Sequence, residues 1–306
     1  MKISTIKTRA NIMLFLTALI WGVTFVAQKT AMDNLSPCTF NGLRCLIGSL
    51  TLFIISFFIK SKHETKYQKS CLVKGGITAG ILLFFAMTLQ QTGIVTSAAG
   101  KAGFISSLYI VMVPLFSVLT GKIPEKHAWF GVLSATLGLY LLCIKSGFVM
   151  ERGDLTILFS AVFFALHILC IAKYAKKTDA IMLSCLQFLF AGVFAAAAGL
   201  IFETVQISDI LLSAKEILYT GVLSCAIAFT LQIRAQRYVR PYIASLILSL
   251  ESVFAVAASF LVLGEILTLK EISGCIFMLF AVYIAQCRKH SIYGRIAVFN
   301  NKGRKA

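Results

Sequence analysis

Two charged side chains stand inside long apolar stretches of this 306-residue chain. Arg44 lies in the stretch 38–59, and Glu251 lies about ten residues into the stretch 242–263. Burying an ionisable group inside a membrane costs free energy, so such a residue is first considered as part of a functional site. A carboxyl group there is costly to ionise, which suits proton exchange or contact with a cationic group. A guanidinium there needs an anionic partner, carbonyl oxygens or water.

Each charge also has a structural interpretation that the residues alone leave open. Arg44 could contact a substrate carboxylate or phosphate, or it could anchor or gate the extracellular end of the protein. Glu251 could handle a proton or a cationic group, or it could pair permanently with a base or cap a packed polar cluster.

Further candidates share one face of an expected helix over 12–31. Trp21, Thr24 and Gln28 follow Thr17 at i+4, i+7 and i+11, which places them on one side. Helix packing is the alternative, because small and hydroxyl residues are common where membrane helices meet. His167 is also deep in an apolar stretch, where it could line a pathway or form a hydrogen-bonded packing contact.

The elements that must position these residues are membrane-spanning helices. The chain is 58% apolar and 13% charged, with a mean hydropathy of +0.88, whereas soluble domains are about 45–50% apolar and about 25% charged. We therefore expect an all-α integral membrane protein. Its ten predicted spans are 12–31, 38–59, 72–92, 97–120, 127–145, 154–173, 180–202, 215–234, 242–263 and 271–287.

Several function classes are disfavoured by what remains outside the spans. No segment has room for a soluble nucleotide-binding domain, and no G-x-x-x-x-G-K-[ST] occurs. No H-E-x-x-H or G-x-S-x-G occurs either, so we predict no enzyme. The nine cysteines form no C-x-x-C and fall almost all in apolar stretches, which predicts buried apolar residues and no metal site or cofactor.

The net charge of +17 is interpreted from where the charges lie. Lys and Arg number 22 on the side of the N-terminus, five on the opposite side and two within spans. Cytoplasmic loops are enriched in both, so we expect a multi-pass cell-membrane protein with both termini in the cytoplasm. Nucleic acid is not an expected partner. The basic cytoplasmic tail 288–306 could contact anionic lipid.

The chain repeats itself at an offset of 142 to 143 residues. Residues 88–90 match 230–232, and the pattern of spans and short loops repeats with them. In this register Tyr109 corresponds to Glu251. Each repeat, 10–145 and 152–287, has five spans, an odd number, so the second enters the membrane from the opposite side. Inverted repeats of this kind place a substrate site near the midplane between the halves.

Several short motifs resemble the EamA domain of the drug/metabolite transporter superfamily. They lie at 18–25, 96–104, 107–109, 235–239, 244–246, 249–251 and 263–265, with Lys29, Arg44 and Pro114. The resemblance covers about residues 10 to 287 and implies ten helices in two inverted EamA repeats around a central cavity. It also implies a carrier that is often an exporter of amino acids or related metabolites. Ser252 stands where the second copy commonly has proline, so no proline kink is carried over to the ninth span.

We therefore predict a secondary carrier of small polar metabolites that works by alternating access, and specifically an amino-acid or metabolite exporter. The alternatives are a drug or other small-molecule efflux carrier, a non-transporting scaffold or a lipid-handling protein. A small-molecule substrate and the lipid bilayer are the expected partners, Glu251 suggests proton coupling, and a homodimer is left open. The predicted substrate-binding or gating residues are Trp21, Thr24, Gln28, Arg44, Tyr109, His167 and Glu251.

Overall fold

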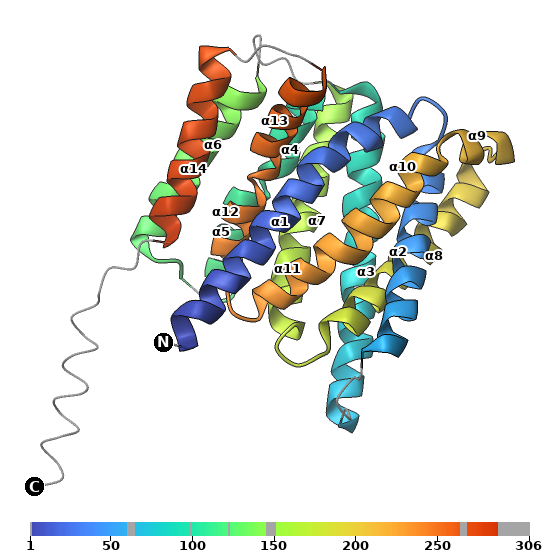
Figure 1. Ribbon diagram of the computed structural model, residues 1–306, viewed down its shortest axis with the longest axis horizontal. Helices are drawn as coiled ribbons and strands as arrows, with labels where there is room; N and C mark the ends of the chain where they lie inside the picture. The colour runs from blue at the N-terminus through green and yellow to red at the C-terminus, as the bar shows by residue number, and fades with distance from the viewer. Residues whose placement is uncertain are drawn as a thin grey trace, which may run out of the picture.

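A computed structural model describes residues 2–59, 65–97, 99–121, 123–144, 151–263 and 268–286 as a bundle of helices (Figure 1). In chain order the helices are α1 (Lys2–Ala31), α2 (Pro37–Phe58), α3 (Lys66–Thr96), α4 (Ala99–Ser107), α5 (Tyr109–Leu119), α6 (Lys126–Cys143), α7 (Arg152–Tyr174), α8 (Ala180–Phe202), α9 (Ile207–Leu212), α10 (Ala214–Tyr219), the π-helix η1 (Thr220–Ala228), α11 (Phe229–Gln236), α12 (Pro241–Leu248), α13 (Glu251–Leu263) and α14 (Leu269–Gln286). The predicted tail 288–306 lies outside the described residues.

The helices account for the ten predicted spans. Within the described residues, eight helical segments are long and apolar enough to cross a membrane. The other two spans are α6 and α14, with 18 residues each. At a rise of 1.5 Å per residue each is about 27 Å long, close to the thickness of the hydrocarbon layer. The all-helical membrane fold is confirmed.

The helices of the first half make the same kinds of contacts with the second half as the corresponding helices of the second half make with the first. The second helices of each half, α2 and α8, pack against each other, as do the last ones, α6 and α14; Figure 1 shows these pairs at opposite edges of the bundle. Between them, α1 packs on η1, α11, α12 and α13, whereas α7 packs on α3, α4 and α5. This exchange is what a pseudo-two-fold relation between two five-span repeats requires.

Glycines allow the paired helices to approach closely. A Cβ on Gly138 of α6 would lie 2.8 Å from the carbonyl oxygen of Gly274 in α14, and a Cβ on Gly274 would lie 2.7 Å from the Gly138 oxygen. Both distances are shorter than van der Waals contact. Close backbone packing through small residues is how membrane helices associate where lipid tails are as apolar as the side chains.

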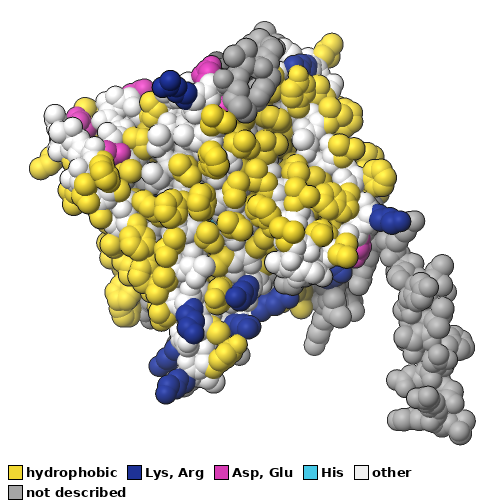
Figure 2. Space-filling view, turned by 180° about the vertical axis from the view of Figure 1, so that it is seen from behind, with side chains coloured by type: hydrophobic (Ala, Val, Ile, Leu, Met, Phe, Trp, Pro, Cys, Tyr) yellow, Lys and Arg dark blue, Asp and Glu magenta, His cyan; other side chains and the backbone are white. Residues whose placement is uncertain are grey.

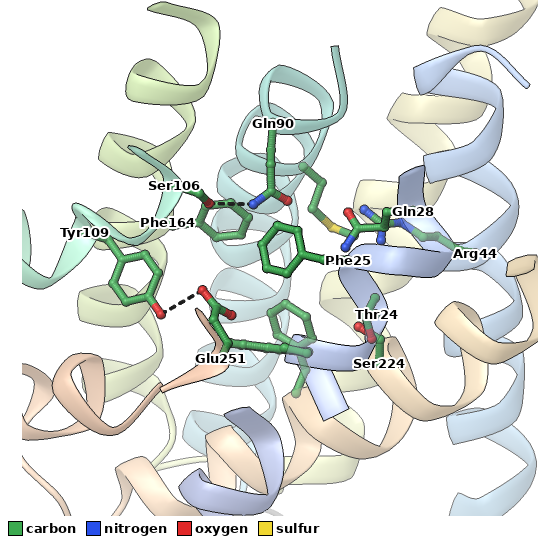
Figure 3. Close-up of a pocket in the computed structure, with 13 residues that line it drawn as sticks. Thr24, Phe25, Gln28, Arg44, Gln90, Ser106, Tyr109, Phe164, Ser224 and Glu251 are labelled. Atoms are coloured by element: carbon green, nitrogen blue, oxygen red, sulfur yellow. Dashed lines mark hydrogen bonds between the residues drawn. The ribbon is translucent and has the colours of Figure 1, made fainter. Parts of the chain in front are cut away.

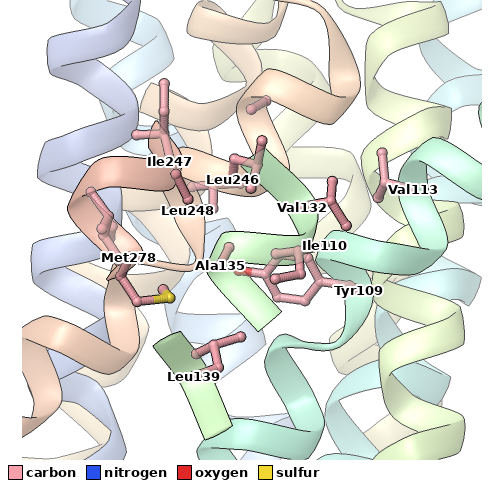
Figure 4. Close-up of a cluster of buried hydrophobic side chains, with 14 of the residues drawn as sticks. Tyr109, Ile110, Val113, Val132, Ala135, Leu139, Leu246, Ile247, Leu248 and Met278 are labelled. Carbon is pink, nitrogen blue, oxygen red and sulfur yellow. The ribbon is translucent and has the colours of Figure 1, made fainter. Parts of the chain in front are cut away.

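An apolar cluster joins α5, α6, α12 and α14 and forms one wall of the protein interior (Figure 4). Ile110, Leu139, Leu246 and Met278 are fully buried in it. Tyr109 belongs to the same cluster, and its ring is therefore fixed by packing while its hydroxyl is free to reach a polar partner.

The fourth and ninth spans are both interrupted, and at equivalent positions. The fourth divides into α4 and α5 at Leu108, and the ninth into α12 and α13 at Ser249 and Leu250. At each interruption the backbone forms i to i−3 hydrogen bonds, from Leu108 N to Ile105 O and from Leu250 N to Ile247 O. The chain is therefore tightened there, in the manner of a 3₁₀ turn.

Proline does not account for these interruptions. Pro114 is a residue type that bends helices, but it lies inside α5, beyond the interruption at Leu108. The ninth span has Ser252 where proline is common and is interrupted all the same. Because the two interruptions lie at the same position in the two repeats, we attribute them to the backbone arrangement around Tyr109 and Glu251.

The eighth span carries a nine-residue π-helix, η1, between α10 and α11. π-Helices are rare in proteins, and those that do occur often lie at functional sites. Its counterpart in the first half, α3, is a continuous α-helix of 31 residues, so the halves differ at this point.

Charge is distributed unevenly between the two ends of the bundle. Figure 2 shows Lys and Arg side chains gathered mainly at the lower end, where Figure 1 places the start of α1 and the end of α14, and Asp and Glu side chains mostly at the upper end. The surface between them is largely apolar. This is the surface expected of a protein embedded in a bilayer.

Candidate functional site

A cavity lies between the two halves, in the middle of the bundle (Figure 3). Its volume is about 50 Å³, room for a few water molecules. Its walls come from seven spans, four of the first half and three of the second, and are lined by Trp21, Thr24, Phe25, Gln28, Arg44, Met87, Gln90, Ser106, Tyr109, Phe164, Ser224, Phe229 and Glu251. Six of the seven predicted site residues are therefore brought together.

One end of the cavity is acidic. Glu251 is the first residue of α13 and is only 5% exposed. Its Oε1 accepts hydrogen bonds from the Tyr109 hydroxyl at 3.2 Å and the Ser107 hydroxyl at 3.3 Å. Ser107 also lies 3.2 Å from the Ser252 hydroxyl. The carboxyl group thus sits where the two interrupted spans meet, held by neutral hydroxyl groups.

The other end of the cavity is basic. Arg44 lies two turns into α2, about 10 Å along the helix axis, and is 2% exposed. Its Nε donates to Asn41 Oδ1 at 2.9 Å, and its guanidinium lies 4.9 Å from the centre of the Phe40 ring. Both partners belong to α2 itself. In the part of the chain that the structure describes, neither Arg44 nor Glu251 forms an ion pair.

Aromatic rings separate the two charged ends. Phe25 lies between them in Figure 3, and Phe164 lies beside Ser106 near the acidic end. Trp21 packs against Phe229, with ring centroids 4.6 Å apart. The arrangement isolates the two charges from each other by apolar surface, so each remains available to a charged group of opposite sign.

Two buried polar atoms of the lining have no hydrogen-bond partner in the described structure. They are the indole Nε1 of Trp21, a donor, and the amide Oε1 of Gln28, an acceptor. Gln28 lies beside Arg44 in Figure 3. Buried polar groups are almost always hydrogen-bonded, so an unpaired donor and an unpaired acceptor facing one cavity point to a polar ligand or to bound water.

His167 is the one predicted site residue outside this lining. Its Nε2 lies 3.0 Å from Gln187 Oε1, and its ring packs edge-on against Phe229. In the repeat register His167 corresponds to Thr24 and Gln187 corresponds to Arg44. In the first half, Thr24 and Arg44 face the cavity. In the second half, the residues at the corresponding positions form a hydrogen bond with each other and do not line the cavity.

Sequence reasoning missed several lining residues. Phe164 could have been found, because it corresponds in the repeat to Trp21. Gln90 is polar at membrane depth, and its amide donates to Ser106 at 2.6 Å. Ser224 faces the cavity from the π-helix η1, and no local sequence pattern distinguishes a π-helix from an α-helix.

A helical membrane protein built from two related halves, with a polar cavity between them, has the architecture of a transporter. The chain matches the EamA-like transporter family twice, over residues 8–144 and 151–286. It belongs to that family.

Individual relatives agree with this assignment. An uncharacterized transporter of Archaeoglobus fulgidus is 36% identical over 280 residues, which cover 91% of this chain and 86% of that protein. The uncharacterized transporter YoaV of Bacillus subtilis is 25% identical, over 87% of this chain and 92% of its own length. A crystal structure with 16% sequence identity has the same fold, with a TM-score of 0.75 over 91% of this chain and 96% of the other.

Proposed function

We propose that this transporter is a secondary carrier that exports a small zwitterionic metabolite, an amino acid or a derivative, across the cell membrane. The observation that carries the proposal is the pair of oppositely charged side chains at the two ends of one cavity, neither of them in an ion pair within the described residues. A zwitterion presents one carboxylate and one ammonium group and would satisfy both ends at once.

Arg44 would bind the substrate carboxylate. A guanidinium offers several planar N–H donors that match a carboxylate in geometry and charge. Within the described residues, only Nε of Arg44 donates a hydrogen bond, to Asn41. This partner lies in the same helix, so Arg44 does not fasten α2 to another span through a hydrogen bond. That favours substrate contact over the anchoring role that the sequence left open.

Glu251 would bind either the substrate ammonium group or a proton. Both occupy the same carboxylate, and the protonated carboxyl group has no charge with which to attract an ammonium group. Binding of one therefore excludes the other. A carrier that returns with a proton after it releases the substrate would couple export to proton entry. Only hydroxyl groups hold Glu251 in the described structure, which leaves its charge free to change.

The cavity must change size during this cycle. A volume of about 50 Å³ holds a few water molecules, and an amino acid needs more. The two halves would separate on one side of the cavity and then on the other, as inverted repeats do in alternating access. Such movement would bend the spans. The free-energy cost of bending should be lowest at the interruptions beside Tyr109 and Glu251 and at the π-helix η1, where the regular α-helical hydrogen bonding is already altered.

We also propose that both termini face the cytoplasm. The start of α1 and the end of α14 lie at the basic end of the bundle in Figure 1 and Figure 2, and Lys and Arg are enriched on the cytoplasmic side of membrane proteins.

Counterflow in liposomes tests the proposal. The purified protein would be reconstituted into liposomes loaded with one unlabelled amino acid at a time, and entry of the same labelled compound would be followed. For at least one amino acid, we expect the labelled compound to enter faster than it enters liposomes without the protein. The rate of entry should be lower with the Arg44→Gln protein. If no compound of a broad metabolite panel exchanged, with or without a pH gradient, the carrier function would be wrong.

A further inference from the structure

A second cavity lies at the end of the bundle where the chain begins. It has a volume of about 370 Å³ and lies between α1, the start of α8 and the end of α11. It is separate from the central cavity, because Thr17 of α1 donates to the Ala228 carbonyl oxygen at 3.0 Å at a level between the two. Its lining residues are Ile6, Arg9, Ala10, Met13, Asp179, Ala180, Arg234, Arg237 and Tyr238.

Three guanidinium groups from two helices converge on this cavity. In the described part of the chain, Arg9 and Arg234 take part in no hydrogen bond or ion pair. Arg237 donates to the Thr178 carbonyl oxygen, while its Nε is buried without a partner. Positive charge on the cytoplasmic side is expected from topology alone, but a buried, unpaired guanidinium nitrogen beside an open volume is not.

The acidic group of the cavity is already engaged. Asp179 precedes α8, and its Oδ1 accepts from Ile181 N at 2.9 Å and from Met182 N at 3.1 Å. It therefore caps the helix and forms no ion pair with the arginines in the described structure. One carboxylate against three guanidinium groups leaves the cavity positive.

We propose that this cavity binds an anion that carries a phosphate group, at a site distinct from the transport cavity. Arginine is the side chain best matched to phosphate, because its donors can bind two oxygens at once. Basic pockets between membrane helices on the cytoplasmic side bind acidic lipid headgroups. The apolar side chains of Ile6 and Met13, which line the cavity, would accommodate an acyl chain. The phosphate can belong to a phospholipid headgroup or be inorganic phosphate.

Binding to the purified full-length protein tests this site. Detergent-solubilised protein would be titrated separately with phosphatidylglycerol, phosphatidylcholine and sodium phosphate, with retained ligand read by native mass spectrometry and stabilisation by the shift in Tm. We expect phosphatidylglycerol or phosphate to bind at least about tenfold more tightly than phosphatidylcholine. The Arg9→Gln/Arg234→Gln protein should lose at least about tenfold in that affinity, the size expected for lost charge-assisted hydrogen bonds.

A matched control removes two charges from the same end of the bundle. Lys69 and Lys74 are exposed near the start of α3 and lie outside the cavity, so the Lys69→Gln/Lys74→Gln protein should bind within about twofold of wild type. If the double arginine variant does not fold, Arg9→Gln alone, at an exposed position in α1, replaces it.

The outcomes separate the sources of the phosphate group. Tight binding of phosphatidylglycerol without binding of inorganic phosphate assigns the site to a lipid headgroup, and competition between the two assigns it to the phosphate group alone. Equal affinity for phosphatidylglycerol and phosphatidylcholine with no phosphate binding would overturn the proposal. An equal loss in the lysine control would overturn it too, because surface charge would then be sufficient. None of these results bears on whether the central cavity carries a zwitterion.

Discussion

Glu251 and Tyr109 show at the scale of single residues how two related halves make one asymmetric site. They occupy corresponding positions in the repeats, each at the first turn of the helix that follows an interruption, and the tyrosine hydroxyl donates to the carboxyl group. Arg44 and Gln187 correspond likewise, but Gln187 is engaged with His167. Substitution at equivalent positions has thus placed one acid and one base on the same cavity.

Replacement of Glu251 by glutamine tests its dual role. In the wild-type protein, the apparent affinity for a zwitterion should weaken as the pH falls, because protonation of Glu251 removes the charge that attracts the ammonium group. Glu251→Gln should bind at every pH about as weakly as the wild-type protein does at low pH, and should therefore lose this dependence. Counterflow rates measured across a pH series would show it.

Tyr109→Phe is the matched control for that variant. It removes one hydrogen bond to the carboxyl group but leaves the carboxyl group in place, so transport should still depend on pH. A Glu251→Gln protein that kept the wild-type pH dependence would contradict the assignment of proton exchange to this residue.

Replacement of Arg44 tests carboxylate binding. Arg44→Gln should weaken substrate binding by at least about tenfold, the equivalent of one lost hydrogen bond between charged groups, and Arg44→Lys should recover only part of it because lysine lacks the planar donor set. Substrate titration in detergent, with Tm measured on the same samples, checks this. An unchanged affinity together with a lowered Tm would favour an anchoring role.

At the scale of helices, the sequence predicted the number and order of the spans but not their interruptions. Apolar stretches of about 20 residues report directly on membrane crossing, so the ten-span prediction is confirmed. The interruptions at Leu108 and at Ser249 and Leu250 follow from packing around the centre of the bundle. Pro114, the local signal for a bend, lies in the helix that follows. The π-helix η1 likewise has no sequence signature.

Close packing of α6 on α14 gives a prediction about stability. Gly274→Leu would insert a side chain where even a Cβ would lie 2.7 Å from the Gly138 oxygen, so the helices must separate. Overpacking of this kind costs about 1–3 kcal/mol. Thermal unfolding in detergent should show a lower Tm for this variant than for wild type.

Ser273→Leu is the matched control on the same helix. Among the residues that the structure describes, the Ser273 hydroxyl bonds only within α14, to the Leu269 carbonyl oxygen, so a leucine there should change the Tm little. Equal Tm values for the Gly274→Leu and Ser273→Leu proteins would contradict the close approach of the two helices.

At the scale of the whole molecule, the odd number of spans in each half determines how the two halves are oriented in the membrane. Two copies of five spans enter the membrane in opposite directions, and a cavity forms between them near the middle of the bundle. The sequence predicted six of the lining residues because polar groups are conspicuous in apolar stretches. It could not indicate that Phe25, Met87 and Phe229 also face the cavity, because apolar residues there resemble those that face lipid.

The proposed orientation can be measured directly. A fluorescent reporter that folds only in the cytoplasm should be bright when it is fused after residue 306, and alkaline phosphatase, which is active only outside, should be inactive at the same point. Fusions within 203–206, between α8 and α9, should give the reverse. The opposite pattern would show that the basic end faces outward.

The most direct measurement of the central claim compares a transported amino acid with two analogues, each of which lacks one charge. Counterflow of the labelled amino acid into liposomes would be competed with its methyl ester, which has no carboxylate, and with the matching hydroxy acid, which has no ammonium group. The account predicts that the unlabelled amino acid inhibits strongly and that each analogue inhibits at least about tenfold less. Inhibition by either analogue that equals that of the amino acid would contradict recognition of a zwitterion by Arg44 and Glu251.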